Sequence, residues 1–518
     1  MPFVDGGASR REHDYSVNKD TKNIVIIGNG LIGCLTAYFL KYHTPNLKNK
    51  NIIVVDRHDK IAQETSFANA GRFCPSSISL HTPNKSFSPL KLFIPDFILK
   101  LKYMREKNKT ADPFIPEKLQ TFSKLAVTPS LIHFGLFNIG FLQNFVSSKY
   151  YVKPASEHTG KARRILAKLA IESMDAIINE NKYIKEHIQY NQGTLYLYGT
   201  AFQRDYYDKC KIANMLENNF NRTRTYPKHK CYQLYPWLKT FKQYSAGYNF
   251  PGCSVIAHDW TADAHLFTTF IASKLLNNSR TMNSNSVSFK YNTTVKELLY
   301  KNDDPKECIG VAIDDGSGST IIECEKVIVC AGINTPKLTS LKLPMHGMQG
   351  YSIDLLDCRS TEGDNLPSVA IADQGSDQLY FQITPYKNGR IRLVGFGNFT
   401  NEIPNDKATL QYAETLLLNY FKYSFPNIKF NAKKKIWSGI RPLSPDNFPI
   451  IGKDINASNV YINSGQGPHG WTLSALSGFL ISYIINQEEN NISKIGNEKD
   501  EDVELLLRYV DPSRFHLY

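Results

Sequence analysis

An apolar run near the start of the chain is followed by glycines and then by a second apolar run with helical spacing. Residues 23–27 read NIVII, which are mostly β-branched side chains typical of a buried strand. Residues 31–40 read LIGCLTAYFL, and residues 51–55 read NIIVV directly before Asp56. This pattern predicts a strand, a glycine turn, a helix and a second strand, in the order of a βαβ unit.

Two later segments show a similar pattern, and two blocks between them differ from it. Residues 326–336, KVIVCAGINTP, predict a short buried strand, and residues 449–482 predict strands, a glycine loop and an apolar helix. Residues 162–180 have helical spacing, whereas residues 346–430 alternate as antiparallel strands do, for example in DQLYFQITPYKNGRIRLVGFG.

We therefore expect an α/β fold with a Rossmann-like domain assembled from discontinuous segments and an inserted α+β domain whose sheet is mostly antiparallel. The length of 518 residues also exceeds what one hydrophobic core usually serves. The expected boundaries are a disordered tail at 1–22, a dinucleotide-binding domain from 23–105, 251–345 and 431–518, and a substrate domain from 106–250 and 346–430.

Composition narrows the class of protein. The apolar content of 42% and the charged content of 21% are those of a soluble globular protein. Nine cysteines without a C-x-x-C pair indicate reduced thiols and an intracellular, cytoplasmic location. The formal net charge of +13 comes without a dense basic block, so we expect a solvated lysine-rich surface and no nucleic-acid partner. Residues 1–22 mix both charge signs, and no apolar run approaches ~18 residues, so neither a targeting signal nor a membrane span is expected.

The three glycines of the first turn are spaced Gly28-x-Gly30-x-x-Gly33. In a dinucleotide site the first glycine permits the tight turn, the second lets a diphosphate approach, and the third lets helix and strand pack closely. Free N–H groups at the start of the helix then bind phosphate, and Asp56 is placed to accept hydrogen bonds from a ribose. The alternative is a strand that meets a helix through a flexible corner, but the flanking elements favour a dinucleotide site.

A second motif follows Asp56 and specifies the dinucleotide. Residues 64–71 read ETSFANAG, and here the chain resembles the D-amino acid oxidase-like flavoproteins, most closely their bacterial D-amino acid dehydrogenase branch. In that branch this loop closes over the flavin, so the resemblance implies FAD. It extends over nearly the whole chain, through QGTLYLY at 192–198, DWTADAHLFTTFIA at 259–272, VIVCAGINTP at 327–336, GYSIDL at 350–355, WSGIRPLSPDNFPIIG at 437–452, NSGQGPHGWTLSALSG at 463–478 and DPSRF at 511–515.

The resemblance also implies a substrate site. Arg441 in GIRP matches the arginine that binds the substrate carboxylate, and a guanidinium suits this role because it donates two parallel hydrogen bonds. The alternative is a structural arginine that pairs with Asp446. Tyr351 and His469 complete the expected catalytic set, although His469 could instead be a surface-loop residue, and Tyr386 could line the pocket.

The remaining expectations concern the cofactor. FAD is expected to be bound non-covalently because the last cysteine, Cys358, lies too early for the late attachment site of sarcosine-type oxidases, and no metal site is expected. Gln349 replaces a lysine of the bacterial pattern, so the charge near the ring could differ. The residues assigned to FAD are Gly28, Gly30, Leu31, Ile32, Gly33, Asp56, Arg57, Thr65, Ser66, Asn69, Ala70, Gly71, Val295, Ala331, Gly332, Arg441, Gly467, His469, Gly470, Trp471 and Thr472.

The reaction implied by the resemblance is oxidation of the C–N bond of an amino acid. Hydride would pass from the α-carbon to the flavin, and the imine would hydrolyse to an oxo acid and ammonia. Three functions stay open: a D-amino acid dehydrogenase that passes electrons to a quinone or other carrier, an oxidase of glycine, sarcosine or D-amino acids that uses O₂, and a flavin-binding interaction protein without activity. Residues 89–107 mix apolar and basic side chains, which predicts a cover helix or, alternatively, peripheral contact with a membrane.

Overall fold

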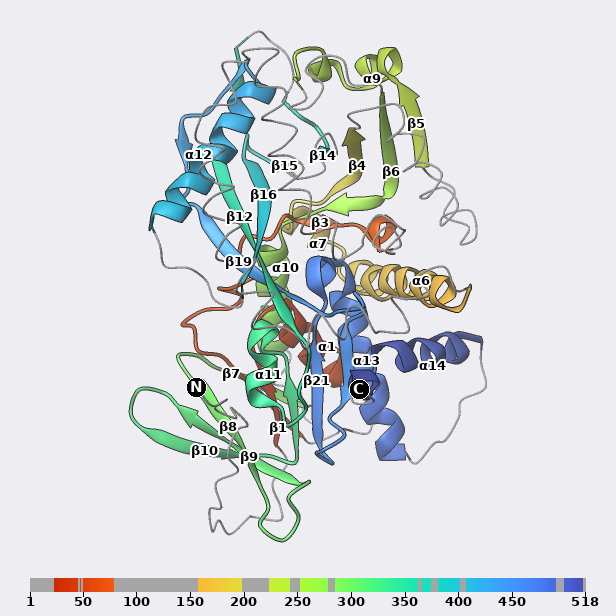
Figure 1. The fold of residues 1–518 in the computed structure, drawn as a ribbon, viewed down its shortest axis with the longest axis vertical. Helices are drawn as coiled ribbons and strands as arrows, with labels where there is room; N and C mark the ends of the chain where they lie inside the picture. The colour runs from red at the N-terminus through yellow and green to blue at the C-terminus, as the bar shows by residue number, and fades with distance from the viewer. Residues whose placement is uncertain are drawn as a thin grey trace, which may run out of the picture.

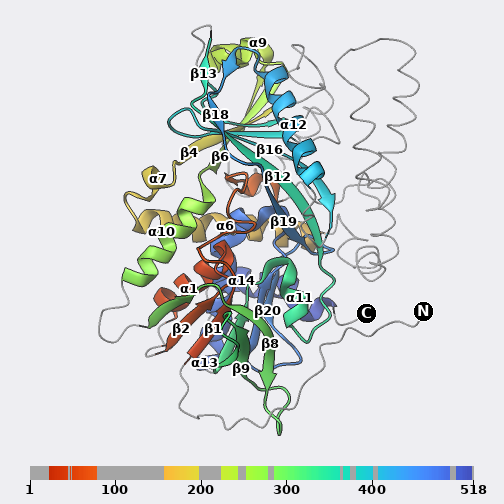
Figure 2. The same cartoon turned by 90° about the vertical axis from the view of Figure 1, so that its left-hand side faces the viewer.

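The fold consists of two large sheets, which lie one above the other in Figure 1 and are seen from a second direction in Figure 2. It is known from a computed structural model. The structure describes residues 23–44, 47, 50–78, 157–197, 223–242, 252–277, 285–361, 366–373, 381–400, 407–490 and 498–515. All structural statements below concern these residues.

The lower sheet, sheet A, has six strands in the order β20-β21-β11-β1-β2-β7, and all neighbours run parallel except β20 and β21. Its strands are rich in Val and Ile because both faces are covered. The strands are β1 (Asn23–Ile27), β2 (Asn51–Val55), β7 (Ser286–Lys290), β11 (Lys326–Val329), β20 (Ile450–Lys453) and β21 (Val460–Ser464).

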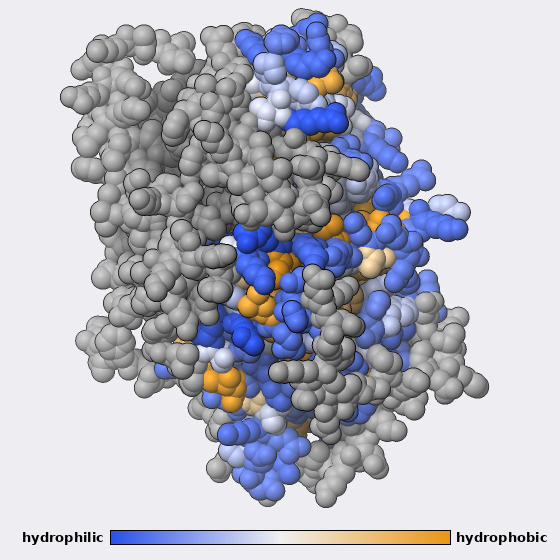
Figure 3. Space-filling model, turned by 90° about the vertical axis from the view of Figure 1, so that its right-hand side faces the viewer, coloured by the Kyte–Doolittle hydropathy of each residue, from blue (hydrophilic) through white to orange (hydrophobic). Residues whose placement is uncertain are grey.

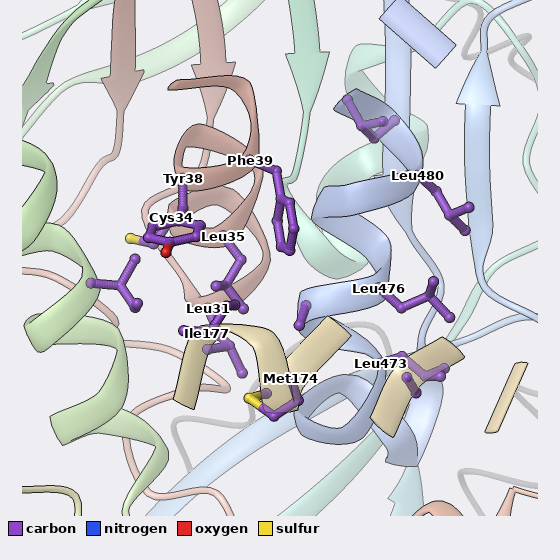
Figure 4. Packing of buried hydrophobic residues seen from close by; sticks show 14 of the residues in the cluster. Leu31, Cys34, Leu35, Tyr38, Phe39, Met174, Ile177, Leu473, Leu476 and Leu480 are labelled. Atoms are coloured by element: carbon purple, nitrogen blue, oxygen red, sulfur yellow. The ribbon is translucent and has the colours of Figure 1, made fainter. Parts of the chain in front are cut away.

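Helices cover one face of sheet A, and a small sheet of β8 (Thr294–Tyr300), β9 (Cys308–Asp314) and β10 (Ser319–Glu323) covers the other. The helices are α1 (Leu31–His43), α6 (Glu157–Glu180), α10 (Ala264–Asn277) and α13 (Gly470–Asn490), with α14 (Glu498–Val510) against α6. Figure 4 shows the apolar side chains of α1, α6 and α13 that meet in this core.

The closest helix pair is α1 with α13, and a glycine makes it possible. A Cβ atom on Gly478 would lie 2.7 Å from the carbonyl oxygen of Leu35 and 2.9 Å from the ring of Phe39. Any side chain at this position would therefore push the two helices apart. Because α1 and α13 each begin at a loop of the predicted cofactor site, this packing sets the distance between those two loops.

The upper sheet, sheet B, has ten strands, and every neighbouring pair is antiparallel except β14 with β4. Its main order is β18-β12-β16-β15-β14-β4-β6-β3, with β19 paired to β12 and β5 paired to β6. The strands are β3 (Arg72–Phe73), β4 (Asn191–Leu197), β5 (Thr223–Pro227), β6 (Gly252–Thr261), β12 (His346–Leu356), β14 (Ala370–Asp373), β15 (Phe381–Pro385), β16 (Ile391–Phe399), β18 (Ala432–Lys433) and β19 (Trp437–Leu443).

The two faces of sheet B differ in chemistry because side chains alternate along each strand. One face is apolar and packs against α9 (Lys228–Leu234) and α12 (Lys407–Ser424). The opposite face carries buried polar and charged side chains at the alternate positions, among them Ser352, Asp354, Arg392, Gln382 and Thr384. Short elements complete the fold: β13 (Arg359–Ser360), β17 (Ile428–Lys429), α7 (Ile184–His187), α11 (Thr335–Leu338), η2 (Pro75–Ser77), η3 (Pro236–Lys239), η5 (Gly332–Asn334), η6 (Gly467–His469) and η7 (Pro512–Phe515).

The α/β fold expected from the sequence is confirmed, including a parallel sheet built from distant segments and a largely antiparallel second sheet. The domain boundaries stay a prediction; β3 and β6, from segments expected in the dinucleotide-binding domain, are strands of sheet B. Hydrophilic residues predominate among the described residues on the face drawn in Figure 3, with apolar residues in small groups between them. No helix among the described residues is long and apolar enough to cross a membrane, and residues 89–107 lie outside the described part.

Candidate active site

The glycine turn after β1 has the geometry that a dinucleotide site needs. Gly28 has φ +109°, and a Cβ there would lie 2.5 Å from the carbonyl oxygen of Cys330. A Cβ on Gly33 would lie 1.9 Å from the carbonyl oxygen of Gly28, so α1 can only pack against β1 without a side chain. Among the described residues, a Cβ on Gly30 would meet only the Ser66 hydroxyl within 4 Å, so no other described side chain crowds this position.

The start of α1 can bind an anion. Its first turn contains no acidic side chain, and Gly30 in its N-cap position offers no side-chain cap. The N–H of Leu31 donates to Ser66 Oγ at 3.1 Å, so the loop after β2 reaches this helix end. Ile32, also assigned to FAD, is half-buried in the same turn. The N–H groups and the positive end of the helix dipole favour a diphosphate here.

Asp56 follows β2 and fixes the neighbouring backbone. Its carboxylate accepts hydrogen bonds from the N–H of Asn29 at 2.8 Å and from the N–H of His58 at 2.9 Å. Burial raises the pKa of Asp56, and these two hydrogen bonds act in the opposite direction. The segment before Val295 joins this group, because the N–H of Thr293 donates to the Asp56 carbonyl at 2.8 Å. The start of β8, which contains Val295, is thus held next to Asp56.

Arg57, expected to bind FAD, is exposed and pairs with Glu64, the first residue of ETSFANAG. Glu64 also contacts His58 Nε2 at 2.8 Å. Burial alone would raise the pKa of Glu64, but Arg57 and the hydrogen bond with His58 outweigh it and lower the pKa. Glu64 therefore holds Arg57 beside Asp56, a role that sequence reasoning did not assign.

The rest of the ETSFANAG loop connects two parts of the predicted site. Thr65 Oγ1 donates to the carbonyl of Ile440, the residue before Arg441, at 2.8 Å. Ser66 contacts the start of α1, as described above. The N–H of Gly71 donates to Asn69 Oδ1 at 2.6 Å, and Gly71 has φ +74°, which favours glycine. The loop thus spans from the diphosphate site to the strand that carries Arg441.

Arg441 lies on β19 beside β12, and a glycine makes room for its head group. A Cβ on Gly350 of β12 would lie 2.4 and 2.6 Å from the two terminal guanidinium nitrogens of Arg441. The structural alternative for Arg441 is not favoured, since the carboxylate of Asp446 accepts from Arg514 Nε at 2.8 Å and Nη2 at 3.2 Å. The buried Asp446–Arg514 pair instead joins the SPD and DPSRF motifs.

The loop before α13 lies next to β19. Gly467 has φ +55° and a Cβ there would lie 3.2 Å from the side chain of Leu443, which follows Arg441 by two residues. His469 is buried at the end of η6 rather than on the surface, and α13 starts at Gly470. The start of this helix therefore faces the region of Arg441 and the glycine turn after β11.

Several expected residues turn their side chains into cores. Trp471 packs edge-on against Trp260 and Phe267, with ring centroids 5.7 and 5.0 Å apart, and Thr472 Oγ1 accepts from the N–H of Cys74 at 3.0 Å. Only the backbone of these two residues is left to face a cofactor. Tyr351 lies in the apolar core under α12, on the face of sheet B opposite to Ser352. Its position gives the hydroxyl no support as a catalytic group.

The other expected positions lie near the glycine turn or under the ETSFANAG loop. Ala331 and Gly332 follow β11 beside Gly28, and a Cβ on Gly332 would meet no atom of the part of the chain that the structure describes within 4 Å. Tyr386 is buried beneath Gly71, with its hydroxyl 2.4 Å from a Cβ at that glycine. Gln349, which replaces the lysine of the bacterial pattern, is buried and donates to Ser438 Oγ at 2.6 Å.

Comparison with known proteins shows the family of the chain. Residues 23–484 match the model of the DAO family, described as FAD dependent oxidoreductase. The chain belongs to the DAO family of FAD-dependent oxidoreductases. D-amino acid dehydrogenases from two strains of Vibrio vulnificus are 26% identical to it over 483 residues, which cover 90% of this chain and 96% of each relative.

Solved structures support the DAO fold. Glycine oxidase from Bacillus cereus superposes with a TM-score of 0.56 at 16% identity, covering 90% of this chain and 97% of that one. L-proline dehydrogenase from P. horikoshii superposes with a TM-score of 0.59 at 16% identity, covering 96% and 98%. At this identity the likeness establishes the fold, a parallel sheet with a largely antiparallel second sheet, and not a substrate.

The cofactor of the DAO family is FAD, and the residues of this chain fit it. The start of α1, which has no acidic side chain in its first turn and where Gly30 carries no side chain, suits the diphosphate, and the Asp56 carboxylate suits the ribose. Sequence reasoning did not assign Asn29, whose side chain accepts from the N–H of Ala62 and donates to the carbonyl of Lys60. Its position between two glycines of the motif was the available signal.

Proposed function

We propose that this DAO-family chain oxidises the C–N bond of a D-amino acid and passes the electrons to a quinone or another carrier rather than to O₂. The observation that carries the proposal is the similarity to the Vibrio vulnificus D-amino acid dehydrogenases, which extends over nearly the full length of both chains. It is supported by the arginine on β19, which has the chemistry to bind the carboxylate of an amino acid.

Arg441 binds the substrate carboxylate in this proposal. A planar guanidinium grips a carboxylate through two parallel hydrogen bonds, which fixes both the position and the orientation of the α-carbon. Gly350 supports the role because the absence of a side chain leaves room for the Arg441 head group. Thr65 further ties the ETSFANAG loop to the backbone of the strand that carries Arg441, at the carbonyl of Ile440.

The cofactor supplies the acceptor for the two electrons, and the chain supplies position. The start of α1, Asp56 and the ETSFANAG loop would hold FAD, and the backbone at the start of α13 would offer N–H groups for developing negative charge. The substrate loses its α-hydrogen with the bonding pair and leaves as an imine once the amine has released its proton. Water then converts the imine to an oxo acid and ammonia. Most of the rate enhancement comes from orientation and water exclusion, without a side-chain base at the α-carbon.

The test mixes the holoenzyme anaerobically with a panel of D- and L-amino acids and follows the loss of flavin absorbance. We expect D-amino acids to bleach the flavin and L-amino acids to leave it oxidised. A soluble quinone analogue added afterwards should restore the colour faster than O₂ does.

The other possible outcomes of this experiment would contradict parts of the proposal. Faster recovery with O₂, accompanied by peroxide, would show an oxidase, and bleaching by L-amino acids would reverse the proposed stereochemistry. If no amino acid bleaches the flavin, the proposal fails.

A further inference from the structure

The ETSFANAG loop, residues 64–71, rests on the polar face of sheet B through its backbone carbonyl groups. The carbonyl of Ala68 accepts a hydrogen bond from Ser352 Oγ at 2.8 Å, and the carbonyl of Asn69 accepts one from Arg392 Nη1 at 2.8 Å. Ser352 belongs to β12 and Arg392 to β16, the next strand in the sheet. Two successive carbonyl groups of the loop thus accept hydrogen bonds from two neighbouring strands of the sheet.

The same relation continues along the loop. The carbonyl of Ala70 accepts hydrogen bonds from Thr384 Oγ1 at 2.8 Å and from Gln382 Nε2 at 3.0 Å. Both donors lie on β15, the strand that follows β16 in the sheet. The carbonyl of Gly71 accepts from the N–H of Ala262 at 2.8 Å. Four consecutive carbonyl groups therefore bind donors from sheet B or from the residue that follows its strand β6. Ordinary loops leave most such groups to water.

A buried charge cluster holds the central donor in place. The Arg392 side chain is 4% exposed and binds Asp354 through Nε at 2.6 Å and Nη2 at 3.0 Å. Arg390 bridges Asp354 and Asp263, at 3.3 and 2.8 Å, and stacks on the Tyr386 ring at 3.9 Å. Burial alone would raise the pKa of Asp354, but Arg392 and Arg390 lower it, so the carboxylate stays charged beside them. Paired burial of this kind fixes the guanidinium at one position.

We propose that Arg392 is a positioning residue for FAD: with Ser352 and Thr384 it holds the backbone of residues 68–71 in the FAD-binding conformation before the cofactor arrives. This inference rests on the proposed contact of that loop with FAD, and it does not depend on which substrate the protein oxidises. Arg392 itself is not among the residues that the sequence assigned to the cofactor.

The physical reason is preorganisation. A loop that samples several conformations binds a ligand more weakly in proportion to the time it spends in the wrong ones. Hydrogen bonds that fix each carbonyl toward sheet B remove those alternatives, because a peptide plane cannot turn without breaking one of them. Removing one donor should therefore weaken FAD binding even though the donor itself is not aimed at FAD.

The test compares the same substitution, Thr→Val, at two buried threonines, only one of which contacts the ETSFANAG loop. Thr384→Val is nearly isosteric and removes the hydroxyl bound to the Ala70 carbonyl. Thr268→Val is the control, because Thr268 is equally buried and its hydroxyl donates to the carbonyl of Ala264 within α10. FAD release from each holoenzyme is followed by the rise of free-flavin fluorescence on serial dilution. Thr384→Val should raise the Kd of FAD by about 10-fold, and Thr268→Val should leave it within about twofold.

A second pair of variants tests Arg392, the charged donor to the loop. Arg392→Lys keeps the charge but cannot bind both Asp354 and the Asn69 carbonyl. Arg514→Lys changes an equally buried arginine whose carboxylate partner, Asp446, lies outside the loop. Both variants should lose thermal stability, but only Arg392→Lys should raise the Kd of FAD and change the visible circular dichroism of the flavin at saturating FAD.

Equal Kd values in Thr384→Val and Thr268→Val would overturn the inference, and so would equal Kd values in the two lysine variants. If Arg392→Lys does not fold, the threonine pair and Ser352→Ala decide the question. Because FAD release is measured without substrate, a failure of D-amino acids to bleach the flavin would refute the proposed function and leave this inference standing.

Discussion

The role proposed for Arg441 can be tested without changing Arg441, by filling the space beside it. In Gly350→Ala the new Cβ would lie 2.4 and 2.6 Å from the guanidinium nitrogens and 2.7 Å from the central carbon. Ordinary van der Waals contact begins at 3.4 Å, so the head group must move by about 1 Å. The site is a backbone position on a paired strand, so β12 cannot easily yield instead.

The size of the effect follows from the geometry of a bidentate grip. A displacement of about 1 Å in a positioning group can cost about 100-fold in rate, and loss of one hydrogen bond to a charged group costs about 1.5–3 kcal/mol. We therefore expect Gly350→Ala to lower kcat/KM for a D-amino acid by about 10- to 100-fold, mainly through a higher KM. Oxidation of the corresponding amine, which lacks the carboxylate, should change far less.

The assay measures initial rates for the amino acid and the amine with an artificial electron acceptor. Gly160→Ala is the control, because its Cβ would be 3.4 Å from the nearest side-chain atom and alanine favours the helix. The double variant with Arg441→Met should be no worse than Arg441→Met alone, since both changes remove the same interaction. An unchanged KM in Gly350→Ala, or full additivity in the double variant, would show that Arg441 does not bind the carboxylate.

Three further predictions concern Asp56, Gly478 and His346. Asp56→Asn should raise the Kd of FAD by about 10-fold, measured by fluorescence on dilution of the holoenzyme, because the carboxylate that orders Asn29 and His58 loses its charge; an unchanged Kd would exclude Asp56 from the cofactor site. Gly478→Ala should lower the free energy of unfolding by about 1–3 kcal/mol in urea, because its Cβ meets the Leu35 carbonyl at 2.7 Å, whereas Gly160→Ala should not. Burial lowers the pKa of His346 from 6.5 to about 4, so the unfolded state binds more protons than the folded state between these pH values. The free energy of unfolding should therefore fall as the pH falls from 6.5 toward 4. Urea unfolding of His346→Gln should show a weaker dependence on pH, and a dependence identical to that of the wild type would refute this prediction.

Local patterns predicted the first βαβ unit of the fold well. The glycine turn, the following helix and the strand before Asp56 are contiguous in sequence, so their geometry follows from side-chain size and period. The pairing of β12 with β19 is different, because Gly350 and Arg441 meet only through a long-range antiparallel register. No local pattern gives that register. The partner of Asp446 was also out of reach, since Arg514 joins it from the far end of the chain.

The side-chain directions were the least predictable part. In GWTLSALSG the helix places Trp471 toward α10 and β6 and Thr472 toward the residue after β3, and only the packing of α13 against these elements decides which face that is. In RIRLVGFG the alternation was visible, but it places Arg392 among buried residues, where a charge is costly unless it is paired. A charged residue at an inward position of a strand was therefore a readable signal, and it indicated the loop-binding face of sheet B.

The ETSFANAG loop contacts elements of both the proposed cofactor site and the proposed substrate site. It touches the start of α1 through Ser66, the Arg441 strand through Thr65, and sheet B through its carbonyl groups. A shift of sheet B relative to sheet A would have to break these contacts together, because each hydrogen bond fixes the same short stretch of backbone. One loop therefore links the strand that carries Arg441, the proposed carboxylate-binding residue, to the start of α1, the proposed diphosphate site, and to sheet B.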